Sequence, residues 1–247
     1  MIRALEQEKI PIDMIVGTSV GSLIGAIYAS DMNSFELEWT AFLLEKDSIF
    51  DFGIMNAFTG MGLAKGDKLE EFVKTKITTV NIEDLKLPFA AVATDLNRGT
   101  RVVLDRGSVA KAVHASSAIP GVFNPVDHQG KLLVDGGVMD NIPIAVAREK
   151  GADLVIAVDI SENVANFNIN NIVDVMLQAV NIMFNENVRY KKKESDVLIS
   201  PQVGGVAMLD FTQKKRCMQA GIEATQKAMP EIRKKIEEWG KNKAAQK

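Results

Sequence analysis

Short apolar runs alternate with segments of helical periodicity along the chain. Continuous apolar runs of strand length are typical of strands buried on both faces, and they occur at residues 14–16, 89–94, 154–158 and 197–199. Residues 100–104 alternate as a strand, and Gln129-Gly130 predicts a hairpin turn into a strand over 131–134. Helices are predicted over 2–9, 20–30, 34–46, 67–76, 108–115, 143–149 and 169–193, and from 212 onward with a break before Pro230. This alternation predicts an α/β layer architecture with a mostly parallel sheet.

Composition narrows the class of protein. The chain has 247 residues, of which 47% are hydrophobic, enough for one sizeable core. We expect one domain over residues 1 to about 210 and a helical tail over 211–247 packed on it. The net charge is −3, and the basic run 191–193 indicates a solvated helix face, so no nucleic-acid partner is expected. Cys217 is the single cysteine, so no disulfide within the chain is possible and no zinc site is indicated. No apolar stretch is long enough to span a bilayer, so we expect no transmembrane segment. We also expect no metal and no cofactor.

The segment Gly17-Thr18-Ser19-Val20-Gly21 lies between the predicted strand 14–16 and the predicted helix 20–30. A Gly-x-Ser-x-Gly turn in this position is typical of a nucleophile elbow, in which Gly17 and Gly21 avoid collisions with the strand or the helix. Ser19 is then the candidate nucleophile, and the backbone N–H of Val20 at the helix start is a candidate oxyanion donor. A turn of small residues required only for packing is the alternative.

A serine hydroxyl needs a base to act as a nucleophile. The two histidines, His114 and His128, both precede the best acidic candidate, so the chain order Ser…Asp…His of common serine hydrolases is not met. That candidate is Asp135, which ends the apolar strand 131–134 and precedes Gly136 and Gly137. An aspartate that merely starts a turn is the alternative. As a sole base, Asp135 requires either a pKa raised by burial or proton transfer concerted with attack.

Five segments in order together resemble the patatin-like phospholipase family. They are Gly17–Leu23, Ala93–Leu104, Ala115–Pro125, Val134–Pro143 and Gly151–Val158. The resemblance implies a three-layer α/β/α fold and a lipid acyl hydrolase, a serine ester hydrolase that works through an acyl-enzyme. It implies a Ser19–Asp135 dyad with Asp135 as general base, an ester lipid as substrate, and no metal or histidine. It assigns Ser116, Ser117, Gly121 and Asn141 a structural role.

The start of the chain departs from the family pattern. Family members carry a strand and a glycine-rich oxyanion loop ahead of the helix that here begins the sequence. We therefore expect Met1 to be an internal methionine and the remaining oxyanion donors to lie in a preceding loop. The alternative function is a catalytically weak or inactive family member that binds lipid or a partner protein. Hydrolysis and transfer of the acyl group to another alcohol are not distinguished.

Two apolar segments are candidates for substrate or membrane contact. The glycine- and phenylalanine-rich segment 47–65 is predicted to be an irregular loop near the site. The apolar positions of 172–184 repeat at helical spacing, which indicates core packing or, alternatively, an acyl pocket or a membrane-docking surface. The expected location is cytoplasmic or at the membrane periphery, and an export signal in the expected preceding segment stays open.

Overall fold

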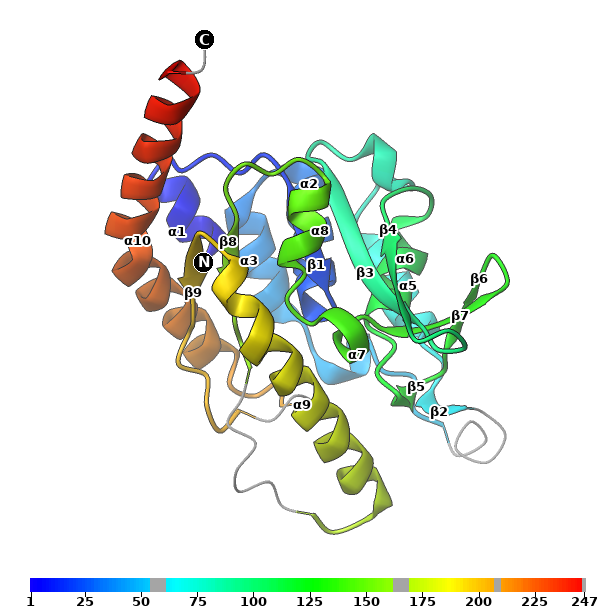
Figure 1. The fold of residues 1–247 in the computed structure, drawn as a ribbon. Helices are drawn as coiled ribbons and strands as arrows, with labels where there is room; N and C mark the ends of the chain where they lie inside the picture. Colours follow the sequence, from blue (N-terminus) through cyan, green and yellow to red (C-terminus); the bar gives the residue numbers. More distant parts are fainter. Residues whose placement is uncertain (54–60, 162–168, 207–209, 246–247) are drawn as a thin grey trace.

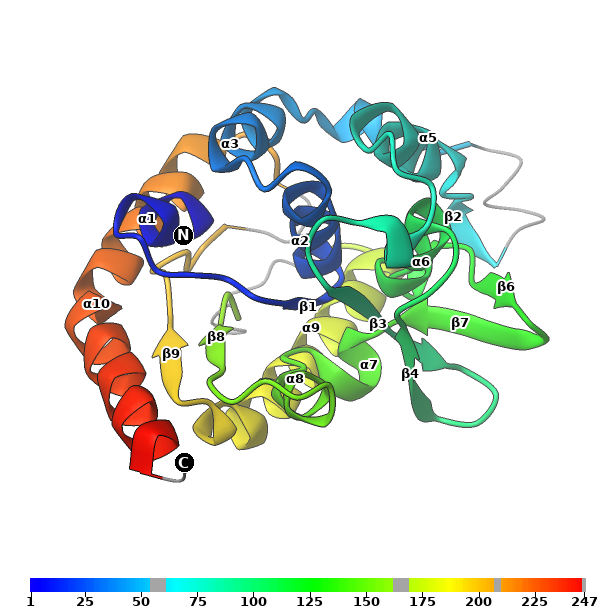
Figure 2. The same ribbon diagram turned by 90° about the horizontal axis from the view of Figure 1, so that it is seen from above.

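A layer of strands lies between two layers of helices in the computed structural model (Figure 1). The structure describes residues 1–53, 61–161, 169–206 and 210–245. Seen from above, α2, α3, α5 and α6 lie on one side of the strands, and α7, α8 and α9 lie on the other (Figure 2). The expected three-layer α/β/α class is confirmed.

The strands form one five-stranded sheet and two parallel pairs among the described residues. The five-stranded sheet contains β1 (Ile15–Thr18), β3 (Phe89–Asp95), β4 (Thr100–Leu104), β6 (Val126–His128) and β7 (Lys131–Asp135). The parallel pairs are β2 (Gly62–Ala64) with β5 (Gly121–Phe123) and β8 (Ile156–Val158) with β9 (Val197–Ile199).

The five-stranded sheet is mixed and thus differs from the mostly parallel sheet expected. β1 runs parallel to β3, whereas the pairs β3–β4, β3–β7 and β6–β7 are antiparallel. The continuous apolar run of β3 explains the expectation, since all seven of its residues are buried. A central strand that is covered on both faces has the same continuous apolar sequence whether its neighbouring strands are parallel or antiparallel to it.

The helices largely follow the predicted periodicity. They are α1 (Ile2–Gln7), α2 (Val20–Asp31), α3 (Ser34–Leu43), α5 (Asp67–Lys76), α6 (Val109–Ser116), α7 (Gly137–Asp140), α8 (Ile144–Glu149), α9 (Ile172–Lys191) and α10 (Lys214–Ala245), with 3-10 turns η1 (Lys46–Ser48), η2 (Ile82–Asp84) and η3 (Lys192–Glu194). The segment 47–65 was expected to be irregular, but it contains most of η1 and all of β2; residues 54–60 lie outside the described residues.

The predicted break before Pro230 is wrong, because α10 continues through this residue. Proline within a helix costs about 3 kcal/mol through the lost hydrogen bond and steric crowding. Met229 and Ile232 on the same helix are buried against Leu5 of α1 and Ile199 of β9. Burial of two such side chains contributes about 1.5–3 kcal/mol each, which offsets the cost.

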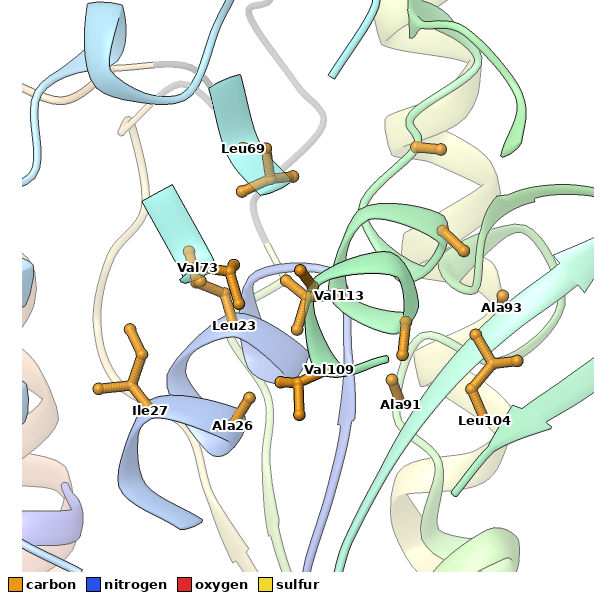
Figure 3. Packing of buried hydrophobic residues seen from close by; sticks show 14 of the residues in the cluster. Leu23, Ala26, Ile27, Leu69, Val73, Ala91, Ala93, Leu104, Val109 and Val113 are labelled. Atoms are coloured by element: carbon orange, nitrogen blue, oxygen red, sulfur yellow. The ribbon is translucent and has the colours of Figure 1, made fainter. Parts of the chain in front are cut away.

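The main core lies between the sheet and the helices α2, α5 and α6 (Figure 3). Leu23 and Ile27 of α2 face Val73 of α5 and Val109 of α6 in this cluster, which extends to Ala91 and Ala93 of β3. The core therefore packs α2 and α6 against β3. The carboxyl ends of β1 and β7 meet at the edge of that strand.

Candidate active site

Ser19 occupies a sharp turn between β1 and α2. Its backbone has φ 55° and ψ −126°, a positive φ that is strained for a residue other than glycine. A Cβ at Gly17 would lie 2.4 Å from the backbone of Gly21, so the turn requires glycine at position 17. A Cβ at Gly21 would meet nothing within 4 Å. The expectation that both glycines avoid collisions therefore holds for Gly17 and is wrong for Gly21.

Ser19 and Asp135 are brought together by two strands that share one edge of β3. β1 pairs with β3 up to Thr18 opposite Val92, and β7 pairs with it from Asp135 opposite Ala93. The opposite edge of β3 is occupied by β4, which pairs over Ala91–Asp95. Because β1 and β7 run in opposite directions, their carboxyl ends converge at this point. Residues 116 positions apart in sequence thus become neighbours.

The carboxyl group of Asp135 is fully buried. Its Oδ1 accepts a hydrogen bond of 2.8 Å from the Gly137 N–H. Burial raises the pKa of Asp135 to about 7, while hydrogen bonding to the Ser19 side chain and the Gly137 N–H acts in the opposite direction. Oδ2 has no hydrogen-bond partner among the described residues. Ser19 is near enough to lower the pKa of Asp135 through its side chain, and hydrogen bonds of this kind are often long or poorly aligned in ligand-free sites.

The first backbone N–H groups of α2 directly follow Ser19 in the chain. The N–H of Val20 and that of Gly21 make no hydrogen bond within the described residues, as expected for the first turn of a helix. The N–H of Ser19 itself is occupied, because it donates to Ser116 Oγ at 3.0 Å. The N–H of Val20, which is the candidate oxyanion donor predicted from the sequence, is therefore available together with that of Gly21, and Val20 as a residue is 49% exposed.

The two glycines after Asp135 lie in close packing. A Cβ at Gly136 would lie 2.1 Å from the Val92 carbonyl oxygen, and one at Gly137 would lie 2.7 Å from the Phe184 ring. Glycine at these positions lets the strand end pack against β3 and α9.

An ion cluster around the buried Asp140 contacts the elbow through Thr18. Thr18 Oγ1 donates to the backbone carbonyl of Asp140 at 2.8 Å. The buried carboxylate of Asp140 accepts from Arg101 at 3.2 Å and from Lys191 at 2.8 Å. The interpretation of residues 191–193 as a solvated helix face is therefore wrong for Lys191. The long aliphatic stem of a lysine lets its ammonium group reach a buried carboxylate from the surface of a helix. The sequence of charges along the helix does not reveal such a contact.

Neither histidine contacts the candidate dyad. His114 is buried, and its Nδ1 lies 3.0 Å from Glu70 Oε1. Its Nε2 packs against Gly66, where a Cβ would lie 2.0 Å away. His128 is half-buried and ends β6 at the hairpin. Gln129 and Gly130 both have positive φ, which confirms the predicted hairpin turn.

The motif residues expected to be structural lie around the same junction. Ser116 ends α6 and is fully buried, and Ser117 caps that helix and is half-buried. Gly121 begins β5 with a positive φ of 80°, which favours glycine, and Asn141 follows α7. Sequence reasoning missed the contact of Ser116 with Ser19 and that of Thr18 with Asp140.

The two apolar segments are partly exposed. Phe50 is buried and stacks on Phe123 of β5, whereas Met61 is 64% exposed. On α9, Val180 and Phe184 are buried in the core, while the first turns are exposed at Ile172, Val175 and Met176. Helix α9 thus contributes buried side chains to the core from Val180 onward and presents apolar side chains over its first turns.

Other features bear on cofactors and membranes. The described residues hold no cluster of three or more histidine, cysteine, aspartate or glutamate side chains placed to bind a metal ion. Within the same ranges, no helix combines the length and apolar character that crossing a bilayer needs. Cavities of about 280 and 210 Å³ are lined by η1 with α5 and by α1, α3 and α10, and neither contains Ser19 or Asp135.

Several known proteins with related names are similar to this chain in sequence. An uncharacterised NTE family protein of Mycobacterium tuberculosis is 35% identical over 163 residues, covering 65% of this chain and 44% of that protein. Patatin-like phospholipase domain-containing protein 6 of Mus musculus is 32% identical over 170 residues, covering 65% and 12%. Lysophospholipase NTE1 of Scheffersomyces stipitis is 26% identical, covering 98% of this chain and 17% of that protein. The chain thus spans less than half the length of these relatives.

A solved structure shares the fold. The crystal structure of VipD from Legionella pneumophila superposes with a TM-score of 0.54 at 15% identity, covering 94% of this chain and 63% of that one. A family model described as patatin-like phospholipase matches residues 1–148, more than half of the sequence. The chain belongs to the patatin-like phospholipase family.

Proposed function

We propose that this protein is a lipid acyl hydrolase that uses Ser19 as nucleophile and Asp135 as its base. The observation that carries the proposal is the convergence of a serine on a strained elbow with a buried carboxyl whose pKa is raised to about 7. A carboxylate of that basicity accepts a proton from a hydroxyl more readily than an ordinary aspartate does. Family membership and the name lysophospholipase carried by a relative support an ester lipid as substrate.

In the first half of the reaction, Ser19 Oγ attacks the carbonyl carbon of the ester while its proton passes to the Asp135 carboxylate. The carbonyl oxygen becomes an oxyanion, and the Val20 N–H donates to it with the support of the α2 dipole. Collapse of this intermediate breaks the bond to the leaving alcohol, which takes the proton from Asp135. The products are an acyl-enzyme on Ser19 and the free alcohol or lysolipid.

In the second half, Asp135 removes a proton from a water molecule, and the resulting hydroxide attacks the acyl carbonyl. The second intermediate collapses with departure of the Ser19 oxygen, which regains its proton from Asp135. A fatty acid is released, and both residues return to their starting protonation states. The same base serves both halves, so no histidine takes part in these steps.

Hydrolysis of a soluble p-nitrophenyl ester tests the proposal. We expect turnover by the protein and loss of turnover on the order of 10³-fold or more in Ser19→Ala, with an unchanged thermal unfolding midpoint. Release of fatty acid from a lysophospholipid, measured in parallel, tests the substrate class. Turnover that survives in folded Ser19→Ala would contradict the assignment, and a wild-type protein without turnover would favour the lipid-binding alternative.

A further inference from the structure

The hydroxyl of Ser116 lies where the pairing of β3 changes from β1 to β7, at the facing carboxyl ends of those two strands. Its Oγ accepts a hydrogen bond of 3.0 Å from the Ser19 N–H and donates one of 2.6 Å to the Val92 carbonyl. Val92 is the last residue of β3 that pairs with β1, and the next residue, Ala93, pairs with Asp135. The Ser116 side chain therefore bridges the break in the sheet at the level of the candidate dyad.

This position requires a group that accepts and donates at the same time. The Ser19 N–H needs an acceptor, and the Val92 carbonyl needs a donor, because the regular ladder is interrupted there. A hydroxyl supplies both functions from one atom, whereas an aliphatic side chain supplies neither. Ser116 is fully buried, which excludes direct contact of its hydroxyl with bulk water as a substitute partner.

The backbone around Ser116 also holds the strand end that carries Asp135. The Ser116 carbonyl accepts from the Gly136 N–H at 3.3 Å, and the Ala118 carbonyl accepts from the Asp135 N–H at 2.9 Å. One end of α6 thus contacts the nucleophile turn through a side chain and the base through the main chain. A displacement of this end of α6 would therefore change the distance between Ser19 and Asp135.

We propose that Ser116 is a positioning residue, whose hydroxyl holds Ser19 in its strained conformation and directs the nucleophile toward Asp135. This inference rests on the proposed function. Ser116 does not itself touch the reacting atoms, since its Oγ hydrogen is directed to Val92 and the oxygen faces the Ser19 N–H. Because the Ser19 N–H is occupied in this way, the elbow can offer an oxyanion the N–H groups of Val20 and Gly21 but not that of Ser19.

The test compares Ser116→Ala with Ser30→Ala. Ser30 is a buried serine of α2 whose hydroxyl donates to the Ile27 carbonyl at 2.8 Å, so its removal matches the loss of one buried hydroxyl away from the dyad. We expect Ser116→Ala to lower kcat for a p-nitrophenyl ester on the order of 10²-fold with little change in KM, since a misplaced nucleophile has this effect. Ser30→Ala is expected to retain the wild-type kcat within about twofold, because its hydroxyl bonds the Ile27 carbonyl within α2, away from the dyad.

The pH profile separates positioning from general damage. Ser19 lowers the pKa of Asp135 through its side chain. A displaced Ser19 no longer does so, and the acidic limb of kcat/KM therefore moves to higher pH in Ser116→Ala only. If Ser116→Ala does not fold, Ser116→Cys gives the same comparison, because a thiol of similar size is a weak donor and acceptor.

Hydrogen exchange at the Ser19 amide gives a readout that does not depend on catalysis. We expect faster exchange of this amide in Ser116→Ala than in wild type or Ser30→Ala. If wild-type protein shows no ester turnover, the proposed function fails while this measurement still tests the role of Ser116 in holding the turn. Unchanged exchange, or an unchanged kcat and pH profile in an active protein, would overturn the inference.

Discussion

Ser19 and Asp135 lie at the facing ends of two strands that share one edge of β3, where Thr18 pairs with Val92 and Asp135 with Ala93. The arrangement brings a half-buried turn that carries a hydroxyl to a carboxyl in the core. Burial raises the basicity of that carboxyl, and the proposed mechanism uses Ser19 as nucleophile and Asp135 as base.

The activity is expected to depend on the ionisation of Asp135. Burial raises its pKa to about 7, and only the carboxylate accepts the Ser19 proton. The value of kcat/KM for a neutral p-nitrophenyl ester should rise as pH increases through about 7 and level off above. A profile that is already flat from about pH 5 upward would show that the acting base has an ordinary carboxylate pKa.

The same shift predicts a pH-dependent stability difference between wild type and Asp135→Asn. The folded-state pKa of about 7 exceeds the ordinary value of 3.8, so the folded protein holds this proton longer than the unfolded chain does. The stabilisation is complete below about pH 4 and is lost as pH rises through about 7. Between about pH 5 and pH 8, wild type should therefore lose roughly 2–3 kcal/mol relative to the variant. Urea unfolding of both proteins at the two pH values measures this difference; parallel curves would contradict it.

The two glycines of the elbow should respond differently to alanine. Gly17→Ala places a Cβ 2.4 Å from the Gly21 backbone, and we expect a loss of several kcal/mol or a failure to fold. Gly21→Ala meets open space within a helix, so its unfolding free energy should stay equal or rise by up to about 1 kcal/mol. Thermal unfolding of the two variants makes the comparison, and equal losses would show that the turn is not packed as described.

The buried carboxylate of Asp140 should make the protein sensitive to Lys191. The substitution Lys191→Met removes the hydrogen bonds of 2.8 Å that the lysine Nζ donates to Asp140 Oδ1 and to the Met139 carbonyl. We expect a loss of about 1–3 kcal/mol, because among the described residues the carboxylate keeps only Arg101 as a charged partner. Lys193→Met is the matched control, since Lys193 is exposed and lies two residues further along the chain, in η3. Similar unfolding midpoints for both variants would contradict the role assigned to Lys191.

Local pattern predicted several elements together with their bounds. Strand 100–104 follows its alternation, helix 67–76 its helical periodicity, and strand 197–199 its continuous apolar run. Strand β2 was missed, since its three residues depend on pairing with β5 about 60 positions later. Helix α10 passes Pro230 because side chains from α1 and β9 pack on it, a contribution that no local signal contains.

The candidate dyad could be predicted from its glycine-rich turns, but its support could not. The Ser19 turn and the Asp135 turn each carry a residue type that the chemistry requires, next to glycine residues. The role of Ser116 arises from an interruption in strand pairing, which is visible only when β1, β3 and β7 are placed together. A serine at the end of a predicted helix suggests a hydrogen bond to the backbone, but the sequence does not say which backbone group is its partner.

Covalent labelling with a fluorophosphonate, located by peptide mass spectrometry, tests the pairing of Ser19 with Asp135 most directly. The account predicts a single adduct on Ser19 in wild type, and loss of labelling in Asp135→Asn although that variant stays folded and keeps its serine. Labelling of another residue, or equal labelling rates at Ser19 with and without the Asp135 carboxylate, would contradict it.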